Sequence, residues 1–206
     1  MRCLIKWRLV KRNPDTSTDE ELLMAARSGD QGAFAQLVKR HADRVATTAK
    51  GMLGDTPEAE DVGQETFVRL FHSLKTFRGE SKLGTYLTRI AINLSINELR
   101  RRKRHDILYA PTGGRPYDER HVVPDPVSEF EYDAMESRDA VRTAIASLKP
   151  RLRAVIVLRL IDGYSTKETA GILKIPMGTV LSRLSRAQLK LKEILAPHIG
   201  GGDDKR

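Results

Sequence analysis

Asn93 and Asn97 stand four residues apart in a stretch with helical periodicity. Side chains at this spacing share a helix face, and their amides can hydrogen-bond to the edges of nucleobases. Five consecutive basic residues follow them: Arg100, Arg101, Arg102, Lys103 and Arg104. Taken alone, the asparagines also fit a solvated face, and the basic residues fit a helix end that interacts with its own dipole. Together with the loop before this helix, they favour nucleic acid as the partner.

That loop spans residues 76–82 and joins two expected helices. Gly79 permits a tight turn within it. The side chains that it brings to the start of the next helix are an aromatic ring, two cations and a hydroxyl: Phe77, Arg78, Ser81 and Lys82.

The sequence shows no arrangement of residues typical of catalysis. The five histidines are scattered without metal-ligand spacing, and no phosphate-binding loop or nucleophile motif is present. Cys3 is the single cysteine, which excludes an internal disulfide and a cysteine-based zinc site. We therefore expect no catalytic residue, metal or cofactor, and we expect an intracellular chain without a membrane span, since no apolar run approaches the ~18 residues that such a span needs.

Charge is distributed unevenly along the 206 residues, whose net charge is +9. Residues 1–16 carry +4, residues 17–104 carry +3, residues 105–140 carry −6 and residues 141–196 carry +8. A polyanion would attract both basic segments and repel the acidic one. The basic tail before residue 17 fits either a disordered tail, an upstream start codon or, less well, a membrane-surface helix, and Lys6 and Arg8 interrupt any signal-peptide core.

Four amphipathic helices are expected in the first half, which predicts a small helical bundle. The first follows a capping-box pair, Thr18 and Glu21, and Asp30 can cap the second, which Gly54 closes. The third opens at Pro57, with an apolar face of Val62, Phe67, Leu70, Phe71 and Leu74. The fourth begins near Ser81 and ends in the basic cluster.

A linker is expected over residues 105–136, because this stretch is acidic and contains several prolines and glycines.

Further helices are expected over residues 137–196, with Val141, Ile145 and Leu148 on one face and a break at Pro150. Ser165 and Glu168 form a second capping-box spacing. A turn at residues 174–176 leads into a long helix with apolar positions Val180, Leu184, Ala187, Leu191 and Ile194. Two helices joined by so short a turn predict a helix-turn-helix, with an exposed front of Thr179, Ser182, Arg183 and Arg186. A plain helical hairpin is the alternative.

Five segments carry a family resemblance: AEDVGQETFVR (59–69), FRGES (77–81), RIAIN (89–93), GYSTKETA (163–170) and IPMGTVLSRL (175–184). With them the chain resembles an extracytoplasmic-function (ECF) sigma factor, the small two-domain group of the sigma-70 family. The resemblance implies an all-α fold with region 2 at 17–104, region 4 at 137–196, an acidic flexible linker at 105–136, and tails at 1–16 and 197–206.

The resemblance also implies a role for each group of residues. Asp61, Gln64, Glu65 and Arg69 would bind the clamp helices of the polymerase β′ subunit. The loop residues Phe77, Arg78, Ser81 and Lys82, with Asn93 and Asn97, would capture an extruded base of the −10 element, and the five basic residues would hold its backbone. The helix-turn-helix would read the −35 element, and the acidic linker would run towards the RNA exit path.

Further partners implied by the resemblance are the β flap of core RNA polymerase and an anti-sigma factor. The protein would be cytoplasmic and would answer a stress or envelope signal. Three positions depart from the family pattern: Tyr86 stands where tryptophan is common, and Leu181 and Ser185 stand where many members carry basic and aromatic or histidine residues. Two rival hypotheses remain. An ordinary helix-turn-helix regulator leaves the polar face at 61–69 and the acidic linker unexplained, and an enzyme acting on nucleic acid finds no metal-ligand spacing, phosphate-binding loop or nucleophile motif in the sequence.

Overall fold

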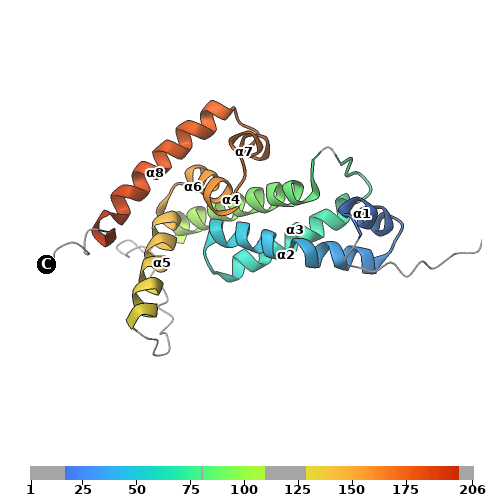
Figure 1. Ribbon diagram of the computed structural model, residues 1–206, viewed down its shortest axis with the longest axis horizontal. Helices are drawn as coiled ribbons and strands as arrows, with labels where there is room; N and C mark the ends of the chain where they lie inside the picture. Colours follow the sequence, from blue (N-terminus) through green and yellow to red (C-terminus); the bar gives the residue numbers. More distant parts are fainter. Residues whose placement is uncertain (1–16, 80, 110–128, 200–206) are drawn as a thin grey trace, which may run out of the picture.

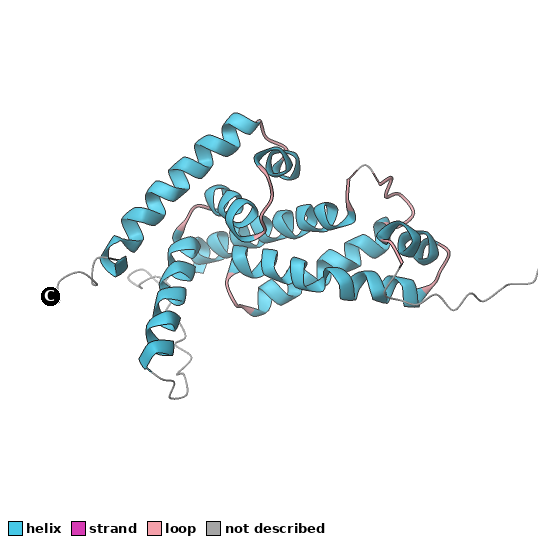
Figure 2. Cartoon of the chain, viewed as in Figure 1, coloured by secondary structure: helices cyan, strands magenta, loops and turns pink. Residues whose placement is uncertain are grey.

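The computed structural model describes residues 17–79, 81–109 and 129–199, and every regular element in these ranges is helical (Figures 1 and 2). The expected all-α fold is confirmed. The expected tail at 1–16 and the central part of the expected linker, residues 110–128, lie outside the described residues. Of the expected tail at 197–206, residues 197–199 belong to the last helix and residues 200–206 lie outside the described part.

Four helices form the first half: α1 (Asp19–Arg27), α2 (Gln31–Leu53), α3 (Pro57–Ser73) and α4 (Leu83–Tyr109). Local signals set their starts. The capping box of Thr18 and Glu21 is present in both directions, and the Asp30 carboxylate accepts a hydrogen bond from the backbone N–H of Ala33 at 3.0 Å. Such caps satisfy N–H groups that the first helical turn leaves without partners.

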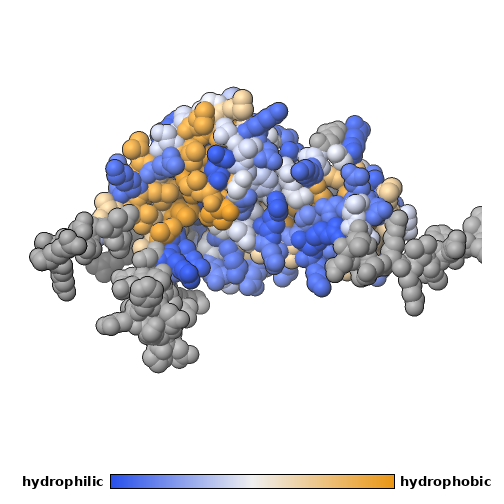
Figure 3. All heavy atoms as spheres, viewed as in Figure 1, coloured by the Kyte–Doolittle hydropathy of each residue, from blue (hydrophilic) through white to orange (hydrophobic). Residues whose placement is uncertain are grey.

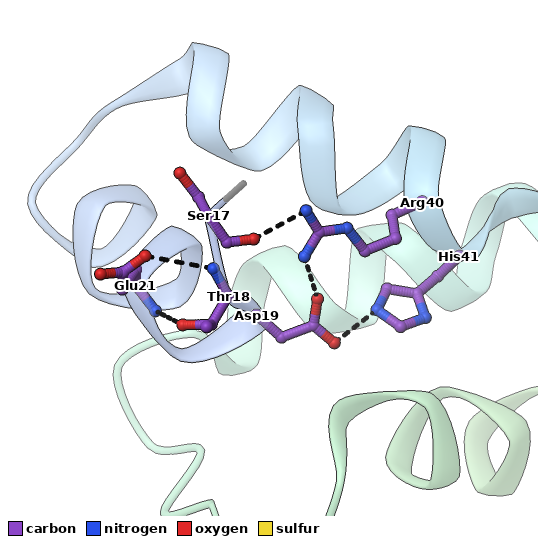
Figure 4. A network of polar contacts seen from close by, with 6 residues as sticks. All are labelled: Ser17, Thr18, Asp19, Glu21, Arg40 and His41. Atoms are coloured by element: carbon purple, nitrogen blue, oxygen red, sulfur yellow. Dashed lines mark hydrogen bonds and ion pairs between the residues drawn. The ribbon is translucent and has the colours of Figure 1, made fainter. Parts of the chain in front are cut away.

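An ion-pair network joins the start of α1 to the middle of α2 (Figure 4). The Asp19 carboxylate accepts from Arg40 and from His41, each at 2.8 Å, while Arg40 also donates to the backbone oxygen of Ser17 at 2.8 Å. Burial alone would raise the pKa of Asp19, but the hydrogen bonds from Arg40 and His41 outweigh it and hold the pKa below its usual value. These contacts fix α1 across the bundle.

The second half consists of α5 (Glu129–Ser147), α6 (Pro150–Ile156), a π-helical turn η1 (Val157–Ile161), α7 (Thr166–Leu173) and α8 (Met177–Ile199). Ser165 and Glu168 form the second predicted capping box. Lys174 takes a left-handed conformation, φ 52°, at the end of α7, and Pro176 precedes α8. The predicted helix-turn-helix is therefore present as α7, turn and α8.

Three expectations about local structure differ from the observed fold. Residues 105–109 continue α4, and residues 129–136 already belong to α5, so both ends of the expected linker are helical. Phe71 belongs to the expected apolar face of α3 but is 56% exposed, because it lies at the surface of the bundle. There it packs edge-on against the ring of Phe34, with centroids 5.3 Å apart. Val141 and Ile194 are likewise exposed rather than inward.

The two halves share one hydrophobic core. Buried residues of α2, α3 and α4 form one contiguous cluster with residues of the second half: Ala154, Val157, Leu158, Tyr164 and Ile172. In Figure 1, α6 lies against α2 and α4, and α7 lies against α4; these three pairs are in contact. The buried guanidinium of Arg153 donates to the backbone oxygen of Met52 at 2.6 Å and to those of Ala146 and Leu148. The helix-turn-helix is thus docked on the first bundle through α6, η1 and α7.

Candidate nucleic-acid and polymerase interfaces

A cavity of about 290 Å³ lies where the loop before α4 meets the first turns of that helix. Its lining residues are Thr76, Phe77, Arg78, Ser81, Tyr86 and Arg89. The rings of Phe77 and Tyr86 stand 4.8 Å apart at 53°, and the Tyr86 hydroxyl donates to Ser73 Oγ at 3.1 Å. The structure therefore places three predicted loop residues, Phe77, Arg78 and Ser81, around one aromatic-walled cavity.

Arg27 on α1 anchors the loop through hydrogen bonds, a role that the sequence alone does not predict. Arg27 Nε donates to the backbone oxygen of Leu74 at 2.8 Å, and its Nη2 donates to the backbone oxygen of Phe77. These partners lie 47 and 50 positions along the chain, so no local pattern points to them. Arg27 positions Phe77 without lining the cavity.

Asn93 and Asn97 lie further along α4 than the cavity and do not line it. Both side chains are exposed, and neither makes a hydrogen bond within the described part of the chain. Asn93 follows the cavity residue Arg89 by one helical turn, so it extends the same face of the helix. Lys82 is exposed at the N-terminal end of α4.

The five basic residues of the cluster divide into two groups. Arg102 contacts Glu58 at 2.7 Å, Thr56 at 3.0 Å and Glu98 at 3.6 Å, and thereby joins α4 to the start of α3. Arg101 pairs with Glu98 at 2.8 Å. Arg100, Lys103 and Arg104 are exposed and lie in no described ion pair. Three cations of the cluster on α4 are therefore outside any described ion pair and exposed to solvent.

The polar face of α3 lies at the surface, as the amphipathic pattern of this helix predicts. Asp61 and Gln64 are exposed, whereas Glu65 accepts from Arg69 at 2.9 Å, an i,i+4 pair on the same face. Beside Gln64 an open, mainly apolar cavity of about 350 Å³ lies between α2 and α3, with Val38, Ala46 and Phe67 among its lining residues. This surface combines carboxylates with a recess for an apolar side chain.

The front of α8 presents its polar residues together. Ser182 and Arg186 are exposed, Thr179 and Arg183 are half-buried, and Arg186 donates to Ser182 at 3.2 Å. Figure 3 shows apolar side chains gathered over α5, α6 and α8, and the exposed apolar residues there include Val141, Leu189 and Ile194. The second half therefore has a polar, basic front and a separate apolar surface.

Within the described ranges, no group of three or more histidine, cysteine, aspartate and glutamate side chains is arranged to hold a metal ion. None of the helices in the described part of the chain has the length and apolar character that crossing a membrane requires.

Comparisons with known proteins agree with this geometry. Residues 37–105 match the family model of sigma-70 region 2, and residues 138–191 match that of sigma-70 region 4. The ECF RNA polymerase sigma factor SigW of Bacillus subtilis is 35% identical over 172 residues, which cover 82% of this chain and 92% of that protein. The ECF RNA polymerase sigma-E factor of Escherichia coli is 35% identical over 193 residues, covering 88% and 96%.

Among solved structures, CnrH, in a complex with the cytosolic domain of CnrY, has a TM-score of 0.63 and 29% identity, and the match covers 88% of this chain and 99% of CnrH. The sigma factor RpoE from Bartonella quintana shares the fold, with a TM-score of 0.60 and 23% identity over 79% of this chain and 96% of RpoE. The chain therefore belongs to the ECF sigma factors, which direct core RNA polymerase to promoter DNA.

Proposed function

We propose that the chain divides promoter recognition between residues 17–104, which read the −10 element, and residues 137–196, which read the −35 element, with residues 105–136 as the connection. As an ECF sigma factor the chain binds core RNA polymerase and directs transcription initiation. It acts in the cytoplasm, where polymerase and chromosome meet, and it has no catalytic activity of its own.

The cavity between the loop and α4 is the observation that carries this proposal. Extruding a base from the duplex costs a few kcal/mol, and stacking on an aromatic side chain returns about 1–3 kcal/mol per base. Phe77 and Tyr86 supply the aromatic walls, while Arg78 and Ser81 supply polar groups. The exposed Asn93, Asn97, Arg100, Lys103 and Arg104 continue along α4, where they would contact the neighbouring nucleotides and phosphates.

The polar face of α3 is proposed to bind the clamp helices of the β′ subunit. Carboxylates repel phosphate but attract a basic protein surface, which favours a protein partner for Asp61 and Glu65. The apolar recess between α2 and α3 supports this role, because it would accept one apolar side chain of the partner next to Gln64.

The front of α8 is proposed to enter the major groove of the −35 element through Thr179, Ser182, Arg183 and Arg186. The apolar surface over α5, α6 and α8 is proposed to bind the β flap and an anti-sigma factor. CnrH, at 29% identity, was solved with the cytosolic domain of a second protein, which supports a regulatory partner for this chain. The chain would act in response to a stress or to an envelope signal.

Run-off transcription with purified core polymerase tests the proposal. Promoter fragments that vary independently in the −10 and −35 elements should give transcripts of defined length only when this chain is added, and both elements should matter. Transcription that ignores either element would overturn the division of labour. Tight, specific binding of the free chain to duplex promoter DNA, without co-purification with core polymerase, would instead favour a helix-turn-helix regulator.

A further inference from the structure

Arg89 lines the cavity beside the loop and has no role in the proposed function described above. It extends from α4 into the lining formed by Phe77, Arg78 and Tyr86. Its Nε is buried and makes no hydrogen bond within the described part of the chain. A desolvated donor without an acceptor is unfavourable, and most such groups in proteins find a partner. The Nε of the cavity-lining Arg89 is therefore a buried donor without an acceptor among the described residues.

The guanidinium determines which ligand edge fits. Arginine carries donors only, in a planar fork that matches two adjacent acceptor atoms. Guanine offers such a pair at O6 and N7, and cytosine offers one at N3 and O2. In adenine an amino donor stands beside N7 and N1, and in thymine the N3–H donor separates O2 from O4. Only guanine and cytosine can accept both hydrogen bonds of the fork.

Arg89 is better placed for this role than the other polar groups near the cavity. Arg78 is exposed on the loop, whereas Arg89 is held by a regular helix and is partly buried, so less conformational entropy is lost when a ligand binds. Asn93 does not line the cavity. Of the described residues around the cavity, Arg89 is the guanidinium fixed on a helix.

We propose that Arg89 selects the base captured in this cavity and that it favours a base with two adjacent acceptors, guanine or cytosine, over adenine and thymine. This inference rests on the proposed function, because it assumes that the cavity receives a nucleobase of the opened −10 strand. It adds the residue and the hydrogen-bond pattern that discriminate among the four bases.

The test uses holoenzyme reconstituted from the full chain and core polymerase. A pool of forked DNA, with randomised bases on the single-stranded non-template side, is bound and then sequenced. The wild-type holoenzyme should enrich guanine or cytosine at one position by roughly 5- to 150-fold, the range for a good bidentate contact. Arg89→Lys keeps the charge but loses the planar fork of donors. The enrichment ratio of guanine or cytosine at that position should therefore fall towards 1, while the ratios at other positions stay as in the wild type.

Arg142→Lys is the matched control, since Arg142 is exposed on α5 away from the cavity, and it should leave every preference unchanged. A second measurement needs no variant: 7-deazaguanine removes N7 and 3-deazacytosine removes N3, and either analogue should abolish the preference of the wild type. An unchanged profile for Arg89→Lys, a selected adenine or thymine at the affected position, or indifference to the analogues would overturn the inference. A wild-type holoenzyme that shows no base preference at any position would refute the proposed function instead.

Discussion

The hydroxyl of Thr48 on α2 donates a 2.9 Å hydrogen bond to Asp162 Oδ2 at the end of η1, 114 positions further along the chain. Beside it, the Tyr164 hydroxyl contacts Thr88 Oγ1 at 2.9 Å and Arg44 Nη1 at 3.2 Å. Polar contacts therefore accompany the shared apolar core where the helix-turn-helix half docks on the first bundle. This docking makes the stability of the packed arrangement dependent on the protonation of Asp162.

Stability should fall as pH rises through the titration of Asp162. Burial raises the pKa of this carboxyl to about 6, while the hydrogen bond from Thr48 and the charge of Arg44 oppose the rise. A packed-state pKa above the unfolded value means that the packed state binds the proton more tightly, so the contribution is full below about pH 4 and is lost as pH passes about 6. Urea denaturation of the wild type between pH 4.5 and 7.5 measures this loss.

Asp162→Asn is the matched variant, because its amide oxygen still accepts from Thr48 but does not titrate. The free energy of unfolding of the wild type minus that of the variant should decrease from pH 4.5 to about 6.5 and then stay level. A difference that is independent of pH would show that Asp162 is not the titrating group.

Gly51 should be a second determinant of docking. A Cβ built on it would lie 3.1 Å from both methyl groups of Val157 and 3.5 Å from Ile161 Cδ1. A glycine in a helix interior normally costs about 0.5–1 kcal/mol relative to alanine, yet a larger side chain here collides with η1. Gly51→Leu should therefore separate the two halves and increase the radius of gyration in small-angle X-ray scattering while helical circular dichroism is retained.

Gly171→Leu is the control for that measurement, since Gly171 also lies in a helix but has open space around its missing Cβ. It should leave the radius of gyration unchanged. An equal response of the two variants, or no expansion with Gly51→Leu, would contradict a docking surface that depends on this close approach.

The contrast between helix ends and docking shows how far the sequence could predict the fold. The caps at Thr18, Asp30 and Ser165 were predictable because each depends on residues three positions apart. The Thr48–Asp162 contact joins positions far apart in sequence and uses a small side chain with no pattern of its own. The expected flexible linker placed no restraint on the two halves, so their shared core could not be predicted.

The candidate site, like the fold, could be predicted where it depends on neighbouring residues and not where it depends on tertiary contacts. The loop residues Phe77, Arg78 and Ser81 were identified, whereas Arg89 and Arg27 acquire a role only when the fold brings α4 and α1 to the loop. The pairing of Arg101 with Glu98 could have been found from its i,i+3 spacing. That spacing would have separated Arg101 from the unpaired members of the basic cluster, whereas the pairing of Arg102 with Glu58 on another helix depends on the fold.

Reversing charge on the polar face of α3 should weaken binding to core polymerase. Asp61 is exposed and lies in no described ion pair, so Asp61→Arg should change the free energy of unfolding by no more than about 0.5 kcal/mol. Because like charges across an interface cost several kcal/mol, affinity for core polymerase should drop about tenfold or more. Glu65→Arg should act in the same direction and also break the pair with Arg69.

Titration of labelled chain with core polymerase measures this affinity, and Glu20→Arg, an exposed acid on α1, is the charge-matched control. Equal affinities for Asp61→Arg, Glu20→Arg and the wild type would remove α3 from the polymerase interface.

Arg27→Ala should loosen the loop and impair the −10 step selectively. The variant loses the hydrogen bonds to the backbone oxygens of Leu74 and Phe77, and bonds from a charged donor are worth about 1.5–3 kcal/mol each in favourable settings. Hydrogen exchange at residues 74–77 should accelerate, and open-complex yield should fall while duplex binding through α8 is retained. Slow exchange in the variant would show that the loop is fixed without Arg27.

The final prediction separates the two DNA-reading surfaces in time. Arg183 and Arg186 stand three residues apart on α8, so both can face one groove, and loss of a bidentate guanine contact by either should cost about 1–3 kcal/mol and relax choice at one −35 base pair. Asn93 lies on α4 beyond the cavity and should act only after the strands open.

With holoenzyme on one promoter, Arg186→Ala should reduce duplex capture in filter binding. Asn93→Ala should leave capture unchanged but lower permanganate reactivity of the opened −10 thymines, because the unpaired strand loses a contact that stabilises it. If Asn93→Ala weakened duplex capture as much as Arg186→Ala, both residues would act in the same step, and the order of −35 docking before −10 base capture would be wrong.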